Sequence, residues 1–251
     1  ASSIMWTQIA DDLAEQGYRV LAYDQRGISP GARPKSSKAY HIKDYMADAM
    51  GIADAVGFEK AHVVGHDMGA VVAWGLSMAH PDRLQSLATM SIPTPDVLKI
   101  RPHAALLSIP WLPEAILQAQ GSKRFYKMLP QNRTEEQDVE YKAIFAEDGA
   151  LSGGLNFYRQ VRPSMRYLKE SLRRPVEANT LFLWGTGEGW VNDAYLAEQN
   201  TRMAPGATLD VVEIQDAGDT GHFLVATQPQ RVLDGLLPHL KANSPSAFGG
   251  P

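Results

Sequence analysis

The 251-residue sequence contains no cysteine, which excludes disulfide bonds, thiolate nucleophiles and cysteine-ligated metals. Its seven histidines form no HExxH motif or similar ligand cluster, so we expect neither a metal nor another cofactor. An excess of positive charge is also lacking, because 28 acidic residues outnumber 24 basic ones. Since binding to nucleic-acid phosphates needs clustered basic side chains, we expect no nucleic-acid partner.

Long apolar runs are lacking as well, and none approaches the roughly 20 residues that span a bilayer. We therefore expect a soluble protein with no membrane partner. The chain starts at Ala1, and a helix-like apolar pattern over residues 4–13 begins almost at once. We expect a cytoplasmic protein, but the sequence leaves open whether an export signal precedes this start.

What the chain does contain is 44% hydrophobic residues, enough for a sizeable core, arranged in alternating helix-like and strand-like segments. The strand-like segments are continuously apolar, which is typical of a parallel sheet covered by helices on both faces. The sequence therefore predicts an α/β fold. Strands are expected at residues 18–23, 61–64, 87–92, 180–184 and 209–214, and helices near 4–13, 42–56, 68–79 and 229–240.

Residues 97–175 interrupt this alternation with helical segments rich in Leu, Tyr, Arg and Pro, and they contain no clear buried strand. We predict that they form an inserted helical cap, with residues 1–96 and 176–241 as the two parts of the α/β core. Residues 242–251 are small, polar and rich in Gly and Pro, and we expect them to be a disordered tail.

A turn around Asp67 is the first candidate for chemistry. The segment Gly65-His-Asp67-Met-Gly69 lies between a predicted strand and a predicted helix. Small residues two positions on either side of a central residue are typical of a nucleophile elbow, a strained turn that exposes the central side chain. Two alternatives stay open on these five residues alone, because glycine-rich turns also bind phosphates and an Asp also caps a following helix.

Two loops near the C-terminus carry the partners that such a nucleophile needs. Glu188 follows the predicted strand at 180–184, and His222 follows the one at 209–214. The chain order of nucleophile, acid and histidine, each just past the carboxyl end of a strand, is that of the catalytic triad in α/β hydrolases. Ligands of parallel sheets bind at these strand ends, so Asp67, Glu188 and His222 are the candidate catalytic residues.

Four short motifs add to this pattern: Gly65–Gly69, Asp24-Gln-Arg-Gly-Ile-Ser29, Asn156-Phe-Tyr158-Arg159 and Gly221-His222-Phe223. Together they resemble the epoxide hydrolases of the α/β-hydrolase superfamily, and the similarity covers nearly the whole chain except its tail. The resemblance implies the α/β-hydrolase fold, with a mostly parallel sheet, flanking helices and an inserted helical cap. It also implies a hydrolase that opens an epoxide to a vicinal diol without a cofactor.

The resemblance assigns a two-step reaction to the candidate residues. Asp67 attacks an epoxide carbon and forms an alkyl ester, and water activated by His222 then attacks the carboxyl carbon of that ester. Glu188 orients His222, although relatives more often carry Asp at this position. Asp193 in the same loop and Asp96 after the preceding strand remain alternatives for the acid.

An epoxide oxygen needs a hydrogen-bond donor as it becomes an alkoxide, and two cap tyrosines usually supply it in this family. Tyr158 resembles the second of them. The first lies seven residues before a cap proline, and matching that proline to Pro110 places His103 there as a candidate donor. Three tyrosines are possible substitutes: Tyr126, Tyr141 and Tyr167. The apolar cap residues at 106–112 suggest a small hydrophobic substrate.

The start of the chain departs from the family. Relatives have a strand that ends in a His-Gly-x-Pro turn before the helix that here begins near Ser3, and this sequence contains no such motif. The turn supplies an N–H to the oxyanion hole, so the N–H of Met68 is the remaining candidate donor. We expect the missing strands to include a central one between residues 19–24 and 61–64, and the chain to be a fragment of a longer gene product.

Two other functions fit parts of the pattern. A haloalkane dehalogenase uses the same Asp and His chemistry, but commonly holds the halide with a Trp directly after the nucleophile, where this sequence has Met68. A thioether is a poor donor to a halide, which favours the epoxide. A catalytically inactive hydrolase fold that only binds a small molecule would fit the absent turn and the altered cap position at His103.

Overall fold

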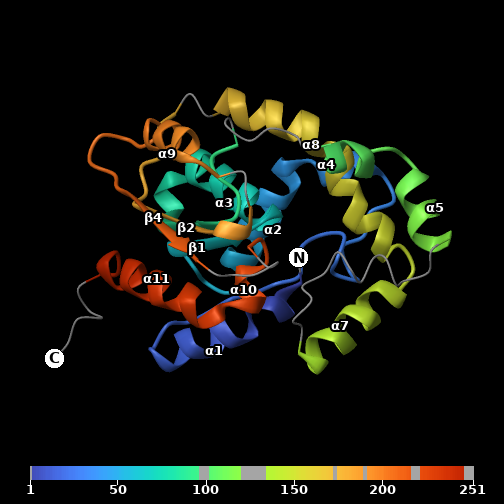
Figure 1. Ribbon diagram of the computed structural model, residues 1–251, viewed down its shortest axis with the longest axis horizontal. Coiled ribbons are helices and arrows are strands. Elements are labelled where there is room, and N and C mark those ends of the chain that lie inside the picture. The colour runs from blue at the N-terminus through green and yellow to red at the C-terminus, as the bar shows by residue number, and fades with distance from the viewer. Residues whose placement is uncertain are drawn as a thin grey trace.

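The computed structural model describes residues 2–95, 102–119, 134–171, 174–188, 191–215 and 221–245. At its centre lies a parallel sheet of four strands in the order β1-β2-β3-β4 (Figure 1). The strands are β1 (Ala61–His66), β2 (Leu84–Met90), β3 (Thr180–Gly185) and β4 (Leu209–Ile214). The prediction of an α/β fold built on a parallel sheet is confirmed.

Burial differs between the central and the edge strands. β2 and β3 lie inside the sheet and are almost entirely buried, whereas β4 lies at an edge and buries only Ile214 fully. β2 begins at Leu84, earlier than we expected, because the polar Gln85 and Ser86 interrupt the apolar pattern. Ser86 is nonetheless buried, since its hydroxyl pairs with Nδ1 of His62 at 2.7 Å.

The sheet separates two apolar clusters. Leu87 of β2 points into a cluster with helices α2, α3 and α8. Ala88 and Met90 point to the opposite face, into a cluster with α1, α10 and α11, and Figure 1 shows α1 and α11 together on that side of the sheet. The bounds of these helices are α1 Thr7–Glu15, α2 Ile42–Ala55, α3 Met68–Ala79, α8 Ala150–Ser171, α10 Leu224–Thr227 and α11 Pro229–Ala242.

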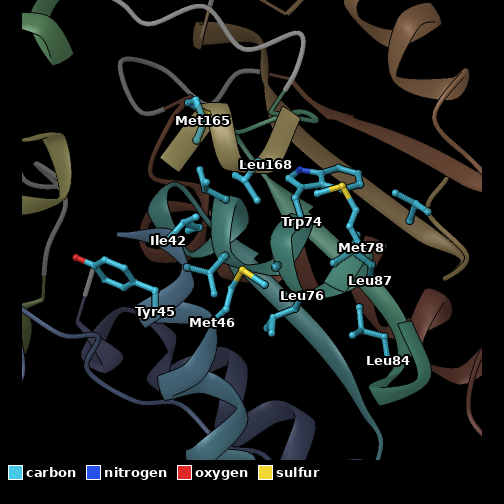
Figure 2. Packing of buried hydrophobic residues seen from close by; sticks show 14 of the residues in the cluster. Ile42, Tyr45, Met46, Trp74, Leu76, Met78, Leu84, Leu87, Met165 and Leu168 are labelled. Atoms are coloured by element: carbon cyan, nitrogen blue, oxygen red, sulfur yellow. The ribbon is translucent and has the colours of Figure 1, made fainter. Parts of the chain in front are cut away.

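Trp74 of α3 is central to the first cluster (Figure 2). It is fully buried, and its indole Nε1 donates to the carbonyl of Ile92 at 3.1 Å, which satisfies the one polar group of the ring. Met46 of α2 and Leu168 of α8 lie close to Gly75 of α3, where an added Cβ would be 2.7 Å from Sδ of Met46. The cluster thus fixes α3, whose first residue directly follows the candidate nucleophile.

The described residues between β2 and β3 form helices and no strand. These are α4 (Pro102–Leu107), α5 (Leu112–Ala119), α7 (Glu135–Ala146) and α8, and Figure 1 shows them gathered on one side of the molecule. We propose that the whole insertion, residues 97–175, is a cap. In the part of the chain that is described, no helix has the length and apolar character needed to cross a membrane.

Residues 18–23 do not form the strand that we expected. No strand within the described ranges pairs with them, and a cavity of about 370 Å³ lies between them and β1. Apolar residues of the flanking helices line this cavity, among them Leu13, Val72 and Leu240. A strand needs neighbours for its N–H and C=O groups, so an apolar pattern alone does not create one. The cavity lies where the resemblance places a further strand.

Two features near the C-terminal half were not anticipated. Helix α9 (Asp193–Asn200) precedes β4, and its polar sequence has almost no apolar stripe to reveal it. The first residues of the expected tail are ordered, because Ser244 contacts Nε2 of His62 at 3.2 Å and the hydroxyl of Tyr18 at 3.3 Å. Residues 246–251 of the expected tail lie outside the described part of the chain.

A backbone contact joins the loop after residues 18–23 to α8 at Gly27 and Gly153. A Cβ added to Gly27 would lie 2.6 Å from the carbonyl oxygen of Gly153, and one added to Gly153 would lie 2.5 Å from that of Gly27. Gly27 also has a φ of +90°, which favours glycine. The loop that follows residues 18–23 therefore approaches α8 as closely as two backbones can.

We expect Gly27→Ala to destabilise the protein more than Gly57→Ala. Gly57 also has a positive φ, of +77°, but an added Cβ there would meet no atom within 4 Å. The control should therefore cost only backbone strain, about 1 kcal/mol, while the clash at Gly27 should add roughly 1–3 kcal/mol. Chemical denaturation measures the free energy of unfolding of both variants. Equal losses of stability would show that the backbone at Gly153 can shift to accommodate the added Cβ.

Candidate active site

The turn at Asp67 connects β1 to α3. β1 ends at His66 and α3 begins at Met68, so Asp67 alone makes the change of direction, with a φ of +51° that is strained for a residue with a side chain. Gly65 permits the turn, because a Cβ there would collide with the backbone of Gly69. The Asp67 side chain makes no capping hydrogen bond to α3, so the capping alternative does not apply.

Three candidate residues meet at the carboxyl ends of the strands. His222 lies just before α10, and its Nε2 is 3.5 Å from Oδ1 of Asp67. Its Nδ1 is 3.1 Å from Oε1 of Glu188, whose side chain is only 2% exposed at the end of the short 3-10 helix after β3. The imidazole thus lies between two carboxylates, in the geometry of a catalytic triad.

Electrostatics favour the charged forms of His222 and Asp67. Burial lowers the pKa of His222, but its hydrogen bonds to Asp67 and Glu188 and their negative charges outweigh this, so the pKa is raised. Burial alone would raise the pKa of Asp67, but the hydrogen bond with His222 and its positive charge hold it well below the usual range. The free protein therefore holds an imidazolium between two carboxylates.

The acid that contacts His222 is Glu188. Asp193 is exposed at the first position of α9, and Asn192 rather than Asp193 caps that helix with its side chain. Asp96, the remaining alternative, lies outside the described residues. Among the described residues, then, the geometry favours Glu188 over Asp193.

Tyr158 reaches the site from α8. Burial raises the pKa of its phenol, and the negative charge of Asp67 raises it further, so the hydroxyl stays protonated and remains a donor. The rest of its motif holds the helix: Arg159 donates to Oδ1 of Asn156 at 2.7 Å and to both oxygens of Glu114, at 2.6 and 2.7 Å. Since Glu114 belongs to α5, this ion pair joins two cap helices beside Tyr158.

The other proposed donors have different positions. His103 belongs to α4, but its side chain lies outside what the structure describes, as does the whole of Tyr126. Tyr141 packs in the apolar cluster with α1 and α11, and Tyr167 stacks against Lys43, with 4.3 Å between the ammonium and the ring centroid. For Tyr158, by contrast, burial and then the negative charge of Asp67 raise the pKa of the hydroxyl.

Sequence reasoning missed two residues that contact the backbone of His222. His66 and Ser91 each place a side-chain donor within 2.9 Å of its carbonyl oxygen. The position of His66 directly before the nucleophile was visible in the sequence, but nothing in the sequence indicates which atom it contacts. Within the described part of the chain, no group of three or more His, Cys, Asp or Glu side chains is arranged so that it could hold a metal ion.

A parallel sheet with a nucleophile turn after β1, a triad at the strand ends and a helical insertion after β2 defines the α/β-hydrolase class. The family model described as alpha/beta hydrolase fold matches residues 1–125. The crystal structure of epoxide hydrolase A from Mycobacterium thermoresistibile superposes with a TM-score of 0.82 at 24% identity, covering 96% of this chain and 88% of that one.

Two relatives with known family assignments are similar to this chain in sequence. The AB hydrolase superfamily protein YfhM of Bacillus subtilis is 29% identical over 94% of this chain and 85% of its own length. Epoxide hydrolase A of Mycobacterium tuberculosis is 26% identical, again over 94% of this chain and 85% of its own length. The chain has the α/β-hydrolase fold, and it resembles epoxide hydrolases in sequence and in fold.

We expect Asp67→Asn to lower the pKa of His222, because the substitution removes a negative charge 3.5 Å from Nε2. NMR titration of the labelled imidazole measures the change, with His222→Gln to assign the signal. Asp193→Asn is the control, since this exposed carboxylate does not contact the ring and its loss should leave the pKa unchanged. An unaltered pKa in Asp67→Asn would contradict the ion pair.

Proposed function

We propose that this hydrolase converts a small hydrophobic epoxide to a vicinal diol through an ester on Asp67. The observation that carries the proposal is a carboxylate on the nucleophile turn whose Oδ1 lies 3.5 Å from Nε2 of His222. A carboxylate suits attack on a saturated carbon, where it displaces oxygen and leaves an alkyl ester. The similarity to relatives such as epoxide hydrolase A of Mycobacterium tuberculosis supports the same substrate class.

In the first step an oxygen of Asp67 bonds to an epoxide carbon and the carbon–oxygen bond of the ring breaks. The released oxygen becomes an alkoxide, and Tyr158 donates a hydrogen bond to it as its charge develops. His103 is proposed as a second donor, because the resemblance places it at the position of the other cap tyrosine. Tyr158 suits this role because its hydroxyl is held in the protonated form.

Formation of the ester changes the charge balance around His222. The carboxylate of Asp67 becomes neutral, so a contribution that raised the pKa of His222 is lost and the imidazolium becomes a stronger acid. Its proton passes to the alkoxide, which becomes the first hydroxyl of the product. His222 is then neutral and ready to act as a base.

In the second step neutral His222 takes a proton from water, and the hydroxide attacks the carboxyl carbon of the ester. The N–H of Met68 is the candidate donor to the oxyanion that forms. Collapse of this intermediate breaks the bond between the carboxyl carbon and the substrate oxygen. The leaving alkoxide takes the second proton of the attacking water, which gives the diol. Asp67 is again a carboxylate beside a protonated His222, which Glu188 holds throughout.

The hydrophobic character of the substrate rests on the sequence of the cap. Leu107 is buried there, whereas Leu106, Ile109 and Trp111 are exposed, with Trp111 71% accessible. The class of epoxide is best determined by comparing alkyl-substituted and aryl-substituted substrates of similar size.

We expect His222→Gln to accumulate the ester. Ring opening needs the nucleophile and the donors, and water can protonate the alkoxide in place of His222, whereas the second step needs the base, so the intact mass of the variant should rise by the mass of one epoxide. Asp67→Asn is the control, because an amide is a poor nucleophile and should gain no mass. If His222→Gln stays unmodified under conditions in which the wild type turns over, the water-activating role of His222 is wrong.

We expect Tyr158→Phe to slow ester formation by about tenfold or more, because it removes a donor aimed at developing charge. Single-turnover kinetics followed by intact mass measure this step directly. Tyr167→Phe is the matched control, since Tyr167 lies on the same helix but stacks on Lys43 through its ring, which Phe retains. Equal rates in both variants would assign Tyr158 a packing role only.

A further inference from the structure

We propose that Ser91 and His66 are positioning residues that hold the backbone of His222 so that its imidazole stays between Asp67 and Glu188. The inference builds on the proposed function, because it concerns the base that activates water. It names no new contact with substrate, and it concerns chiefly the second step, in which His222 is the base.

Both residues donate to one acceptor. Nε2 of His66 is 2.6 Å from the carbonyl oxygen of His222, and Oγ of Ser91 is 2.9 Å from the same atom. His66 is the last residue of β1 and Ser91 is the first residue after β2, so the two donors come from neighbouring strand ends. A carbonyl with two donors fixed on a sheet leaves its residue little freedom to rotate.

The chemistry of the carbonyl defines the state of His66. Because a carbonyl oxygen only accepts hydrogen bonds, Nε2 must carry the hydrogen, and Nδ1 is then a bare acceptor. Burial, and secondly the positive charge of His222, lower the pKa of His66 to about 4, so its ring is neutral near pH 7. The ring centroids of His66 and His222 are only 5.2 Å apart, and a neutral His66 avoids repulsion with the positively charged ring of His222.

The backbone of Ser91 is the second argument. Ser91 is completely buried and has a φ of +66°, a conformation that glycine adopts without strain and serine does not. Its N–H donates to the carbonyl of Leu183 at 3.0 Å, which ties the strained residue to β3. Glycine would relieve this strain, but it would lack the hydroxyl that donates to the carbonyl of His222. The strained residue is therefore also the one that makes the contact.

The test uses Ser91→Gly and Ser91→Ala, which both remove the hydroxyl but differ in strain. Gly relieves the strain and should raise the unfolding temperature, while Ala retains it and should not. Positioning predicts that both variants hydrolyse the Asp67 ester about tenfold more slowly or worse, with its formation changed less than twofold. A purely structural role predicts instead that the rate follows stability and that Gly is harmless.

His66 is tested by His66→Gln and His66→Leu. The amide nitrogen of Gln lies near the position of Nε2 and keeps a donor for the carbonyl, whereas Leu keeps only volume. We expect Gln to retain most of the ester hydrolysis rate and Leu to lose it, again with ester formation preserved. Equal rates in the two variants would remove His66 from the positioning role.

A substrate-independent measurement separates this inference from the proposed function. The Nδ1 proton of His222 faces Glu188 and is observable by NMR in the resting protein. We expect its signal to shift or broaden in Ser91→Gly and His66→Leu but not in Gly57→Ala. An unchanged signal would overturn the positioning role, whereas failure of the wild type to open any epoxide would overturn the proposed function and leave this signal change intact.

Discussion

The contact between the Asp67 carboxylate and the His222 imidazolium determines which charges and positions the neighbouring side chains can have. Two opposite charges in a partly buried site stabilise one another, but each must also be held at the right distance. Glu188 supplies a second carboxylate behind the ring, and the neighbouring groups Tyr158 and His66 are both kept neutral by burial. The site therefore concentrates its charge on three side chains and surrounds them with uncharged donors.

The sheet makes this arrangement rigid by joining the strand ends to one another. The N–H of Asp67 donates to the carbonyl of Met90 at 3.3 Å, and the N–H of Ser91 donates to the carbonyl of Leu183 at 3.0 Å. Asp67 and Ser91 thus occupy corresponding places after β1 and β2, and both have a positive φ. Such strain persists only where the surrounding packing is firm, and the cluster around Trp74 supplies that packing under α3.

Much of the fold was predictable because continuous apolar strands and helical periodicity are local signals. The triad was predictable for a similar reason, since each candidate follows a strand end within a short motif. Strand pairing is not local, so the sequence suggested a strand at residues 18–23 that has no partner in the described structure. The choice between Glu188 and Asp193 and the contacts of Ser91 depend on burial and distance, which motifs do not encode.

The contact between Gly27 and Gly153 has a mechanical consequence for the cap. Two backbones in direct contact cannot move closer or slide past one another without a collision. The contact therefore fixes the position of α8 at Gly153 relative to the loop at Gly27. Tyr158 lies five residues from Gly153 on this helix, which corresponds to about 7.5 Å at the helical rise per residue. Because displacement grows with distance from a pivot, a tilt about this contact would move distant segments of the insertion further than the backbone of Tyr158. The position of Tyr158 close to this contact therefore limits how far such a tilt could displace its hydroxyl.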